Sequence, residues 1–383
     1  MSDSNPLTVI DLFAGVGGIR LGFEYAFNRS NESKLRLETQ FACEIDPYAR
    51  QTYSQNFPIP EDEDFWGDDI RDPEVQNLIK KFDICLAGFP CQAFSKAGHR
   101  KGFEDEKKRG TLFFEVKKIC TKNRPAVIFC ENVRGLFNFG RKGEDGYHEV
   151  YATIRNDLVQ LGYEVFEKIL NSADFGVPQS RERLYIVCFR KDIYESLQKQ
   201  GLRFAFPKNN EFCEISKSWE SHKLEDIRQA GPIDEKYYLS ERYFNTLKRH
   251  KETHKKKGNG FGYVIRKWDQ ISGTILCGNM GRERNLVVDY DHKELIQTNR
   301  ITSPYNQEHV RRLTPTEYMR LQGFPRDFSV QGVSDNQLYK QFGNTVTVPV
   351  IEAIAREIRV VLENVAKTGK SIRGKKGSKS DQN

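Results

Sequence analysis

The alternation of short apolar runs with helical patterns constrains the fold of this chain most. Residues 7–13 (LTVIDLF) are apolar and β-branched, and they run into a glycine-rich turn at residues 14–18 (AGVGG). Further strand-like runs cover residues 39–43, 83–87, 126–130 and 184–189. Helical patterns lie between them, for example at residues 111–120 and 150–161. This order predicts an α/β fold, with a mostly parallel sheet covered by helices on both faces and with ligands beyond the carboxyl ends of the strands.

The composition excludes several classes of protein. The chain has 383 residues, of which 38% are hydrophobic, so it can bury a core and is not a disordered protein. No run approaches the ~20 apolar residues needed to span a bilayer, and residues 1–6 lack the pattern of a secretory signal. None of the eight cysteines forms a C-x-x-C pair, which argues against a zinc site or a dithiol redox motif. We expect no metal site and a reducing, cytoplasmic setting.

The basic residues are unevenly distributed along a chain whose formal net charge is +7. Residues 367–383 hold six basic residues against one acidic residue in a Gly/Ser/Lys-rich context, which predicts a disordered basic tail. Two further basic clusters lie at residues 248–251 and 255–257. All three stretches can neutralise phosphates, and each is equally consistent with a solvated run of charge.

Reactive side chains lie beside three of the predicted strands. The segment GFPCQ (88–92) follows the strand at 83–87, and ENV (131–133) follows the strand at 126–130. The segment QSRER (179–183) comes just before the strand at 184–189. The edge of the sheet is therefore expected to present a thiol, a carboxylate and two guanidinium groups.

Seven sequence blocks, in this order, resemble those of the cytosine-5 DNA methyltransferase family of the bacterial restriction–modification type. They are DLFAGVGG (11–18), GFPCQAFS (88–95), RGTLFF (109–114), ENV (131–133), QSRER (179–183), RRLTPTEYMRLQGFP (311–325) and QFGNTVTVPV (341–350). The resemblance covers residues 7 to about 359 except for the middle third. It implies an S-adenosylmethionine-dependent methyltransferase fold with a smaller target-recognition domain.

The resemblance also assigns the chemistry. Cytosine carbon 5 is a poor nucleophile, and addition of a thiolate at carbon 6 activates it; the family match gives this role to Cys91. Glu131 is expected to donate a proton or hydrogen bond to nitrogen 3 of the ring. Arg183, and more loosely Arg181, is expected to stabilise the carbonyl oxygen of the base, and the alternative is that both arginines are structural ion-pair partners.

The implied cofactor is S-adenosyl-L-methionine, and its contacts follow from the same match. Glu44, after the second strand, is expected to accept the ribose hydroxyls, and Ile45 stands where the family often has an aromatic residue. Asp69 is expected to accept the adenine amino group, with Asp68 as the neighbouring alternative. The remaining expected cofactor contacts are Phe13, Gly15, Gly17, Gly18, Pro90, Leu112 and Asn344.

A base inside a duplex cannot reach a protein thiol, so the target cytosine must rotate out of the stack. The polar loop at residues 92–109 has the composition of a lid over the substrate, or of a plain surface loop. The expected DNA contacts are Gln92, Ser95, Arg100, Lys257, Arg282 and Arg284. The run GNGFGY (258–263) resembles that of enzymes that read CC…GG targets, which is weak evidence for any one sequence.

The resemblance predicts a discontinuous catalytic domain at residues 1–190 and 338–366, and a target-recognition domain at residues 191–337. Thr314 to Glu317 form a capping box, Gly323 ends the short helix that follows it, and Pro349 opens an amphipathic helix that should return beside the first strand. The expected partner is double-stranded DNA, for a monomer in the bacterial cytoplasm, associated with the nucleoid, with a cognate endonuclease for the same site. The alternatives are a dinucleotide-dependent dehydrogenase, a tRNA cytosine-5 methyltransferase and a non-catalytic DNA-binding paralogue.

Overall fold

The computed structural model describes residues 5–29, 33–61, 63–90, 112–208, 221–290, 295–296 and 304–373. The chain divides into two compact units. Unit 1 comprises residues 1–170, 182–209 and 350–383, and unit 2 comprises residues 171–181 and 210–349. Both units are therefore built from discontinuous segments.

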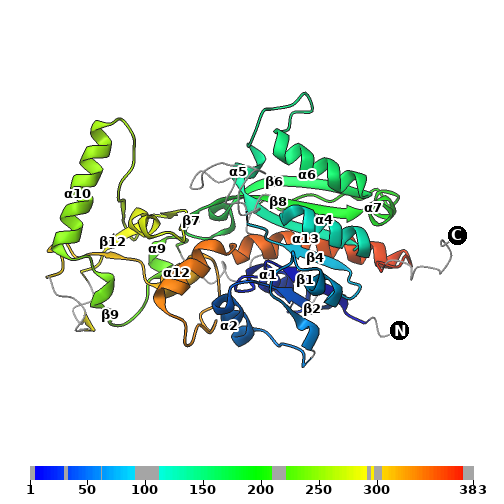
Figure 1. The fold of residues 1–383 in the computed structure, drawn as a ribbon, viewed down its shortest axis with the longest axis horizontal. Helices are drawn as coiled ribbons and strands as arrows, with labels where there is room; N and C mark the ends of the chain where they lie inside the picture. The colour runs from blue at the N-terminus through cyan, green and yellow to red at the C-terminus, as the bar shows by residue number, and fades with distance from the viewer. Residues whose placement is uncertain are drawn as a thin grey trace. The chain divides into compact units, whose positions relative to one another are not determined.

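Unit 1 is built on a seven-stranded sheet in the order β3-β2-β1-β4-β5-β8-β6 (Figure 1). Its strands are β1 (Leu7–Leu12), β2 (Leu37–Cys43), β3 (Trp66–Gly67), β4 (Ile84–Ala87), β5 (Val127–Val133), β6 (Tyr163–Asn171) and β8 (Glu182–Arg190). The pairs β1–β2, β1–β4, β2–β3 and β4–β5 are parallel, whereas β5 and β8 are antiparallel. The mostly parallel sheet predicted from the sequence is confirmed, and β8 is its exception.

The helices of unit 1 lie on both faces of this sheet. They are α1 (Gly18–Phe27), α2 (Pro47–Asn56), α3 (Pro73–Leu78), α4 (Leu112–Asn123), α5 (Arg134–Phe137), α6 (Glu149–Gln160), α7 (Lys191–Gln198) and α13 (Val348–Lys367), with a short 3-10 helix η1 (Glu63–Phe65). Side chains of α3, α4 and α6 share one buried cluster with Ile10, Leu12 and Ile128. Phe23 of α1 packs edge-on against Phe129, which points to the opposite face because side chains alternate along a strand.

Helix α13 is amphipathic, as the sequence predicts. Its inward residues Val350, Ile351, Ile354, Ile358, Val361 and Leu362 are all buried. Gly22 of α1 lies so close to α13 that an added Cβ would stand 2.6 Å from the Cβ of Ile351. The helix therefore returns to pack against α1.

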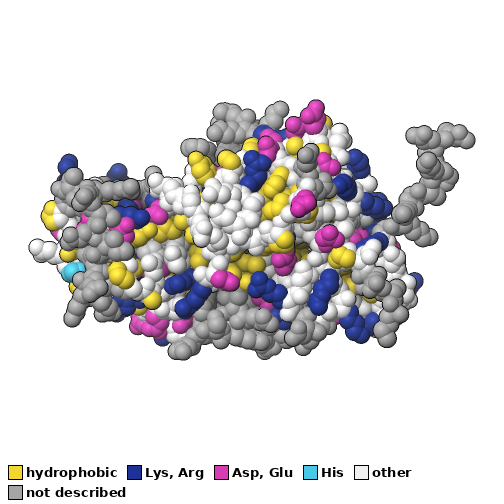
Figure 2. Space-filling model, turned by 90° about the horizontal axis from the view of Figure 1, so that it is seen from below, with side chains coloured by type: hydrophobic (Ala, Val, Ile, Leu, Met, Phe, Trp, Pro, Cys, Tyr) yellow, Lys and Arg dark blue, Asp and Glu magenta, His cyan; other side chains and the backbone are white. Residues whose placement is uncertain are grey.

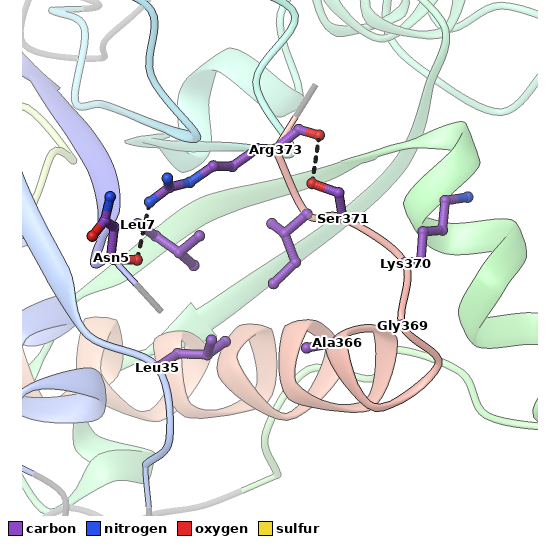
Figure 3. Close-up of a pocket in the computed structure, with 9 residues that line it drawn as sticks. Asn5, Leu7, Leu35, Ala366, Gly369, Lys370, Ser371 and Arg373 are labelled. Atoms are coloured by element: carbon purple, nitrogen blue, oxygen red, sulfur yellow. Dashed lines mark hydrogen bonds between the residues drawn. The ribbon is translucent and has the colours of Figure 1, made fainter. Parts of the chain in front are cut away.

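The segment after α13 is not a free arm as far as residue 373. Ile372 is buried, and its carbonyl accepts a hydrogen bond from Arg190 at 3.2 Å. Arg373 donates to the carbonyl oxygens of Asn5 and Pro6 at 3.0 and 2.7 Å, beside a shallow depression that Leu7 also lines (Figure 3). Residues 367–373 thus differ from the disordered basic tail that the sequence predicts, because the apolar Ile372 and the cationic Arg373 have specific partners. Residues 374–383 lie outside the described part.

Unit 2 consists mainly of short elements. Its helices are η4 (Ser172–Phe175), α9 (Leu224–Ile227), η5 (Glu235–Tyr237), α10 (Glu241–Lys256), η6 (Asn279–Asn285), α11 (Pro315–Leu321) and α12 (Asp335–Asn344). Its strands are β7 (Gln179–Ser180), β9 (Ile233–Asp234), β10 (Ile265–Arg266), β11 (Ser272–Gly273), β12 (Leu286–Val288), β13 (Leu295–Ile296) and β14 (Val310–Arg312). These strands pair as β10-β12-β14, β11-β7 and β13-β9.

A buried ion cluster holds part of unit 2 together. The Arg311 guanidinium bonds to Asp289 at 2.7 Å and to Glu317 at 2.8 Å, and all three side chains are fully buried. Glu317 and Thr314 form the predicted capping box of α11, and Gly323, with a φ of 72°, follows the end of that helix. Arg228 also pairs with Asp289, so two cations face two carboxylates, and this pairing of charges is what makes their burial tolerable.

The unit bounds differ from the predicted domain bounds of 190/191 and 337/338. Residues 171–181 belong to unit 2 because β7 pairs with β11, and unit 1 continues to residue 209. No helix within the described residues is long and apolar enough to cross a membrane.

Candidate active site

Three loops at the carboxyl edge of the sheet are joined by hydrogen bonds. The Ala14 amide donates to the carbonyl of Cys43 at 3.0 Å, and the Glu44 amide donates to the carbonyl of Gly67 at 3.0 Å. The Gly15 amide donates to Oε2 of Glu44 at 2.9 Å. The ends of β1, β2 and β3 therefore form one continuous rim, which is where a parallel sheet places its ligands.

The glycine turn has a backbone that most residues disfavour. Gly15 and Gly17 have φ values of 55° and 83°, and Phe13, with a φ of 57°, is one of few non-glycine residues with positive φ. A Cβ on Gly17 would lie 2.2 Å from Cε2 of Phe57, so only glycine fits between α1 and α2. A Cβ on Gly15 would meet no atom within 4 Å, which leaves open space beside the turn. Gly18 begins α1, whose free amides favour a polar ligand.

Glu44 sits where the sequence places it, directly after β2. Burial raises the pKa of its carboxyl, and the amides of Asp46 and Gly15 counter that shift by donating to it. Each carboxylate oxygen accepts one of these bonds and retains acceptor capacity for a further donor. The next residue, Ile45, is 63% exposed. The two acceptor oxygens of Glu44, the exposed side chain of Ile45 and the open space beside Gly15 together fit a nucleoside with its ribose hydroxyls.

Both candidate carboxylates after β3 have arginine partners. Asp69 accepts hydrogen bonds from the amide and the guanidinium of Arg71, and these bonds lower the pKa of Asp69. Asp68 pairs with Arg50. Asp69 is the less exposed of the two, with 32% of its side chain accessible against 69% for Asp68.

The antiparallel pairing of β5 with β8 brings two more predicted residues together. Because the strands run in opposite directions, the carboxyl end of β5 lies beside the amino end of β8, and Val133 is paired with Arg183. The Nε of Arg183 lies 3.2 Å from Oε1 of Glu131, and both side chains are nearly buried. Asn132 donates to the carbonyl of Phe89 at 3.0 Å, which ties this edge to the segment that ends at Pro90.

Several predicted residues flank or fall within a part of the chain that is not described. Pro90 is the last described residue after β4, and Leu112 begins α4 and packs in the same cluster as Phe13. Cys91, Gln92, Ser95 and Arg100 lie outside the described residues. The sequence nevertheless makes Cys91 the next residue after Pro90.

Arg181 has surroundings unlike those expected of a base-binding residue. Its side chain is 2% exposed, and its guanidinium donates to the carbonyl oxygens of Ile275, Gly343 and Thr345 at 3.1, 3.3 and 2.6 Å. Gln179 is also buried, and it bonds to Ile275 and Leu321. These contacts all lie within unit 2 and give Arg181 a structural role there.

The remaining predicted residues lie in unit 2 and have mixed surroundings. Lys257 is exposed at the end of α10, and Arg284 is exposed with its guanidinium 5.5 Å from the ring centroid of Phe261. Arg282 instead bonds to Asn336 at 3.2 Å and stacks over Tyr339. Asn344 is the last residue of α12.

Three cysteines of the sheet are poorly suited to act as nucleophiles. Burial raises the pKa of the Cys43 thiol to about 12, and it raises the pKa values of Cys130 and Cys188 as well. A thiol in this state carries almost no thiolate at neutral pH. Among the described residues, no group of three or more His, Cys, Asp or Glu side chains is placed to hold a metal ion.

The sequence reasoning missed a buried polar cluster under the glycine turn. It consists of Asp11 of β1, Arg20 of α1 and Tyr53 of α2. Asp11 within the apolar run LTVIDLF is the sequence feature that could have revealed this cluster, because a buried charge requires a partner.

Comparison with known proteins gives the family. The sequence profile of the C-5 cytosine-specific DNA methylases matches residues 7–360. The Type II methyltransferase M.HpaII of Haemophilus parainfluenzae is 42% identical over 372 residues, covering 95% of this chain and 93% of that relative. The Type II methyltransferase M.NlaX of Neisseria lactamica is 37% identical over 358 residues, covering 94% and 98%.

The solved structures agree in fold. The Dnmt2 methyltransferase of S. pombe matches with a TM-score of 0.63 at 20% identity, over 93% of this chain and 98% of that one. Since the family profile spans almost the whole chain and the relatives match along nearly their full lengths, the chain belongs to the C-5 cytosine-specific DNA methylases, which take their methyl group from S-adenosylmethionine.

Proposed function

We propose that this enzyme methylates carbon 5 of a cytosine rotated out of a specific duplex DNA sequence, through a covalent adduct with Cys91. The observation that carries the proposal is the Glu131–Arg183 pair at the sheet edge, with Asn132 bonded to the carbonyl of Phe89. That bond joins the carboxylate's strand to the segment leading into Cys91. Burial raises the thiol pKa values of Cys43, Cys130 and Cys188, which makes these three cysteines poorer candidates than Cys91.

The proposed reaction begins with addition of the Cys91 thiolate to carbon 6 of cytosine. Negative charge then builds on the ring, and the Glu131 carboxyl neutralises it by donating a proton to nitrogen 3. Carbon 5 accepts the methyl group of S-adenosylmethionine, which leaves as S-adenosylhomocysteine. Loss of the carbon-5 proton to solvent, departure of the thiolate and return of the nitrogen-3 proton to Glu131 restore the aromatic ring.

Arg183 has two proposed tasks in this scheme. Its guanidinium holds the Glu131 carboxyl in position, and Nη1 donates to the carbonyl of Glu182 at 2.8 Å, so the N–H groups of Nη2 are the ones that would stabilise the developing charge on the base oxygen. Arg181 has no task at the base in this scheme, because its N–H groups bond to backbone carbonyls of unit 2.

The proposed cofactor contacts are the glycine turn, Glu44 and Asp69, with Pro90, Leu112 and Asn344 completing them. Support comes from the rim that joins Gly15 to Glu44 and from the exposed side chain of Ile45. The open space beside Gly15 lets a ligand approach the backbone closely.

The proposed DNA contacts combine Gln92, Ser95 and Arg100 with Lys257 and Arg284. Residues 248–257 of α10 and its end carry six basic residues against one acidic residue, and Lys255, Lys256 and Lys257 are exposed. Figure 2 shows basic and acidic side chains interspersed on one face, so phosphate binding needs such local clusters. Arg282 is the weaker candidate, since Asn336 and Tyr339 already hold its guanidinium.

We further propose that the enzyme protects DNA against a cognate restriction endonuclease, because relatives such as M.HpaII are named Type II methyltransferases. Labelled methyl transfer to duplex DNA and to tRNA, followed by bisulfite sequencing of the DNA, tests the substrate and the position of the target. We expect methyl transfer to duplex DNA. Cys91→Ser should abolish this transfer, and Glu131→Gln should slow it at least ~100-fold. Transfer to tRNA alone, or full activity of Cys91→Ser, would refute the proposal.

A further inference from the structure

A buried cluster beneath the glycine turn takes no part in the proposed chemistry. Asp11, Arg20 and Tyr53 are 1%, 3% and 0% exposed. Nη1 of Arg20 donates to the Tyr53 hydroxyl at 3.1 Å, and that hydroxyl donates to Oδ2 of Asp11 at 3.4 Å. One neutral hydroxyl therefore accepts from the cation and donates to the carboxyl.

The cluster joins three elements that lead into the cofactor loops. Asp11 lies in β1, two residues before Phe13. Arg20 lies in the first turn of α1, and Tyr53 belongs to α2. The side chain of Asp46 caps α2 by accepting from the amide of Tyr48, and Glu44 lies just before this cap. Movement of α2 relative to α1 would therefore change the spacing between Glu44 and the glycine turn.

The packing around the cluster leaves little freedom between these helices. The guanidinium of Arg20 lies 4.5 Å from the ring centroid of Phe57, and its Nε bonds to Glu24 at 2.6 Å. The rings of Tyr53 and Phe57 are 4.7 Å apart, and Gly17 presses against both of them. The Tyr53 hydroxyl is the polar group that links the two helices inside this apolar contact.

Burial raises the pKa of Asp11 to about 7, with Arg20 and Tyr53 opposing the shift. Glu44 and Glu24 are the other charged groups that act on it. The second carboxyl oxygen of Asp11 has no hydrogen-bond partner among the described residues. Removing the Tyr53 hydroxyl would leave the first oxygen in the same condition, and a buried polar atom without a partner is costly.

We propose that Tyr53 is a positioning residue for the methyl donor. Its hydroxyl fixes α2 against α1, so that the glycine turn and Glu44 keep the spacing that S-adenosylmethionine requires. The inference rests on the proposed cofactor site, although Tyr53 itself touches no ligand in it.

The test compares Tyr53→Phe with Tyr163→Phe in the full-length enzyme. Tyr163 is a matched control, because its buried hydroxyl bonds to the carbonyl of Pro125 at 2.8 Å, at the opposite end of the strands. Equilibrium dialysis with labelled S-adenosylmethionine should give a Kd about tenfold higher for Tyr53→Phe, as expected for loss of a hydrogen bond to charged groups. Tyr163→Phe should bind like the wild type.

If Tyr53 only stabilised the fold, Tyr53→Phe would not change the KM for S-adenosylmethionine separately from kcat. We expect Tyr53→Phe to raise the KM for S-adenosylmethionine, while kcat at saturation and the Kd for duplex DNA stay within about twofold of the wild type. Equal Kd values for the two variants would overturn the inference. Glu44→Ala reports on the site itself: if it also binds like the wild type, the proposed cofactor site is wrong, whereas weak binding by Glu44→Ala alone refutes only the role of Tyr53.

Hydrogen exchange of the wild type avoids any question of whether the variants fold. Addition of S-adenosylmethionine should slow amide exchange in residues 49–56 of α2 together with residues 13–18, because the Tyr53 hydroxyl couples the two segments. Protection of residues 13–18 with unchanged exchange in residues 49–56 would contradict the inference.

Discussion

Arg181→Lys keeps the positive charge of Arg181 but removes the forked guanidinium that reaches three backbone carbonyls. A lysine places all its donors on one nitrogen, whereas Arg181 bonds to Ile275, Gly343 and Thr345 from two. Nη2 bonds to Gly343 and Thr345 and Nη1 bonds to Ile275, so a single lysine nitrogen leaves at least one of these carbonyls without its partner. Hydrogen bonds to charged groups contribute about 1.5–3 kcal/mol each, and unit 2 should lose about that much stability for each carbonyl that loses its partner.

The assay is thermal unfolding followed by fluorescence, together with single-turnover methyl transfer. A loss of about 3 kcal/mol lowers Tm by about 6–12 °C in a unit of this size. Arg183→Lys is the matched variant two residues away, and its main contact is the pair with Glu131. We expect that variant to melt within about 3 °C of the wild type and to lose about 100-fold in rate.

The opposite behaviour of the two variants would refute these roles of Arg181 and Arg183. An Arg181→Lys enzyme that melts like the wild type and turns over slowly would mean that Arg181 contacts the base. An Arg183→Lys enzyme with wild-type turnover would remove Arg183 from the active site.

Three further predictions concern the turn, the buried carboxyl and the DNA. Gly17→Ala should destabilise the protein to urea by more than about 2 kcal/mol, because the new Cβ meets the ring of Phe57 at a φ of 83°; a wild-type midpoint would contradict this packing. Asp11 has a folded pKa of about 7 against an ordinary value of 3.8, so the folded state holds a proton that the unfolded state releases between these values. Stability should therefore fall by up to about 1.4 kcal/mol per pH unit from about pH 4 to pH 7 and level off above, and Asp11→Asn should remove this dependence; parallel pH curves for the two proteins would refute it. Lys257→Ala should lower the slope of log K for DNA against log salt by about 0.9, measured by fluorescence anisotropy, and an unchanged slope would exclude a phosphate contact.

The sequence was most informative where local pattern and chemistry agree. The order of strands and glycine turn correctly placed Glu44 after β2, whereas Glu131, which was expected just after a strand at 126–130, lies within β5. The capping box of α11 and the apolar face of α13 were also readable, because both depend on residues close together in the chain. These features have fixed spacings that a single sequence displays.

The direction of β8 and the separate roles of Arg181 and Arg183 could not be predicted from the sequence. Hydrophobic periodicity is the same for parallel and antiparallel strands, so it cannot show that β8 pairs antiparallel with β5. Arg181 and Arg183 are two residues apart, and in a continuous strand they would face the same side. The strand is interrupted at Arg181, which lies between β7 and β8. The side chains of Arg181 and Arg183 therefore have different surroundings.

Contacts between distant segments were also beyond the sequence. The cluster of Asp11, Arg20 and Tyr53 joins residues 42 and 33 positions apart. The contacts of Ile372 and Arg373 with Arg190 and Asn5 are equally remote in the chain, whereas composition alone suggested a disordered tail. Composition reports what a segment can bury on average and not which partner a single side chain finds.

The proposed reaction depends most on a bond between the Cys91 sulfur and carbon 6 of the target base. A duplex that carries 5-fluorocytosine at the methylated position blocks the final elimination, because fluorine cannot leave carbon 5 as a proton does. Incubation with the enzyme and S-adenosylmethionine, followed by peptide mass spectrometry, should yield a stable adduct on the peptide that contains Cys91, and none with Cys91→Ser. An adduct on another cysteine, or complete methyl transfer with no adduct, would contradict the account.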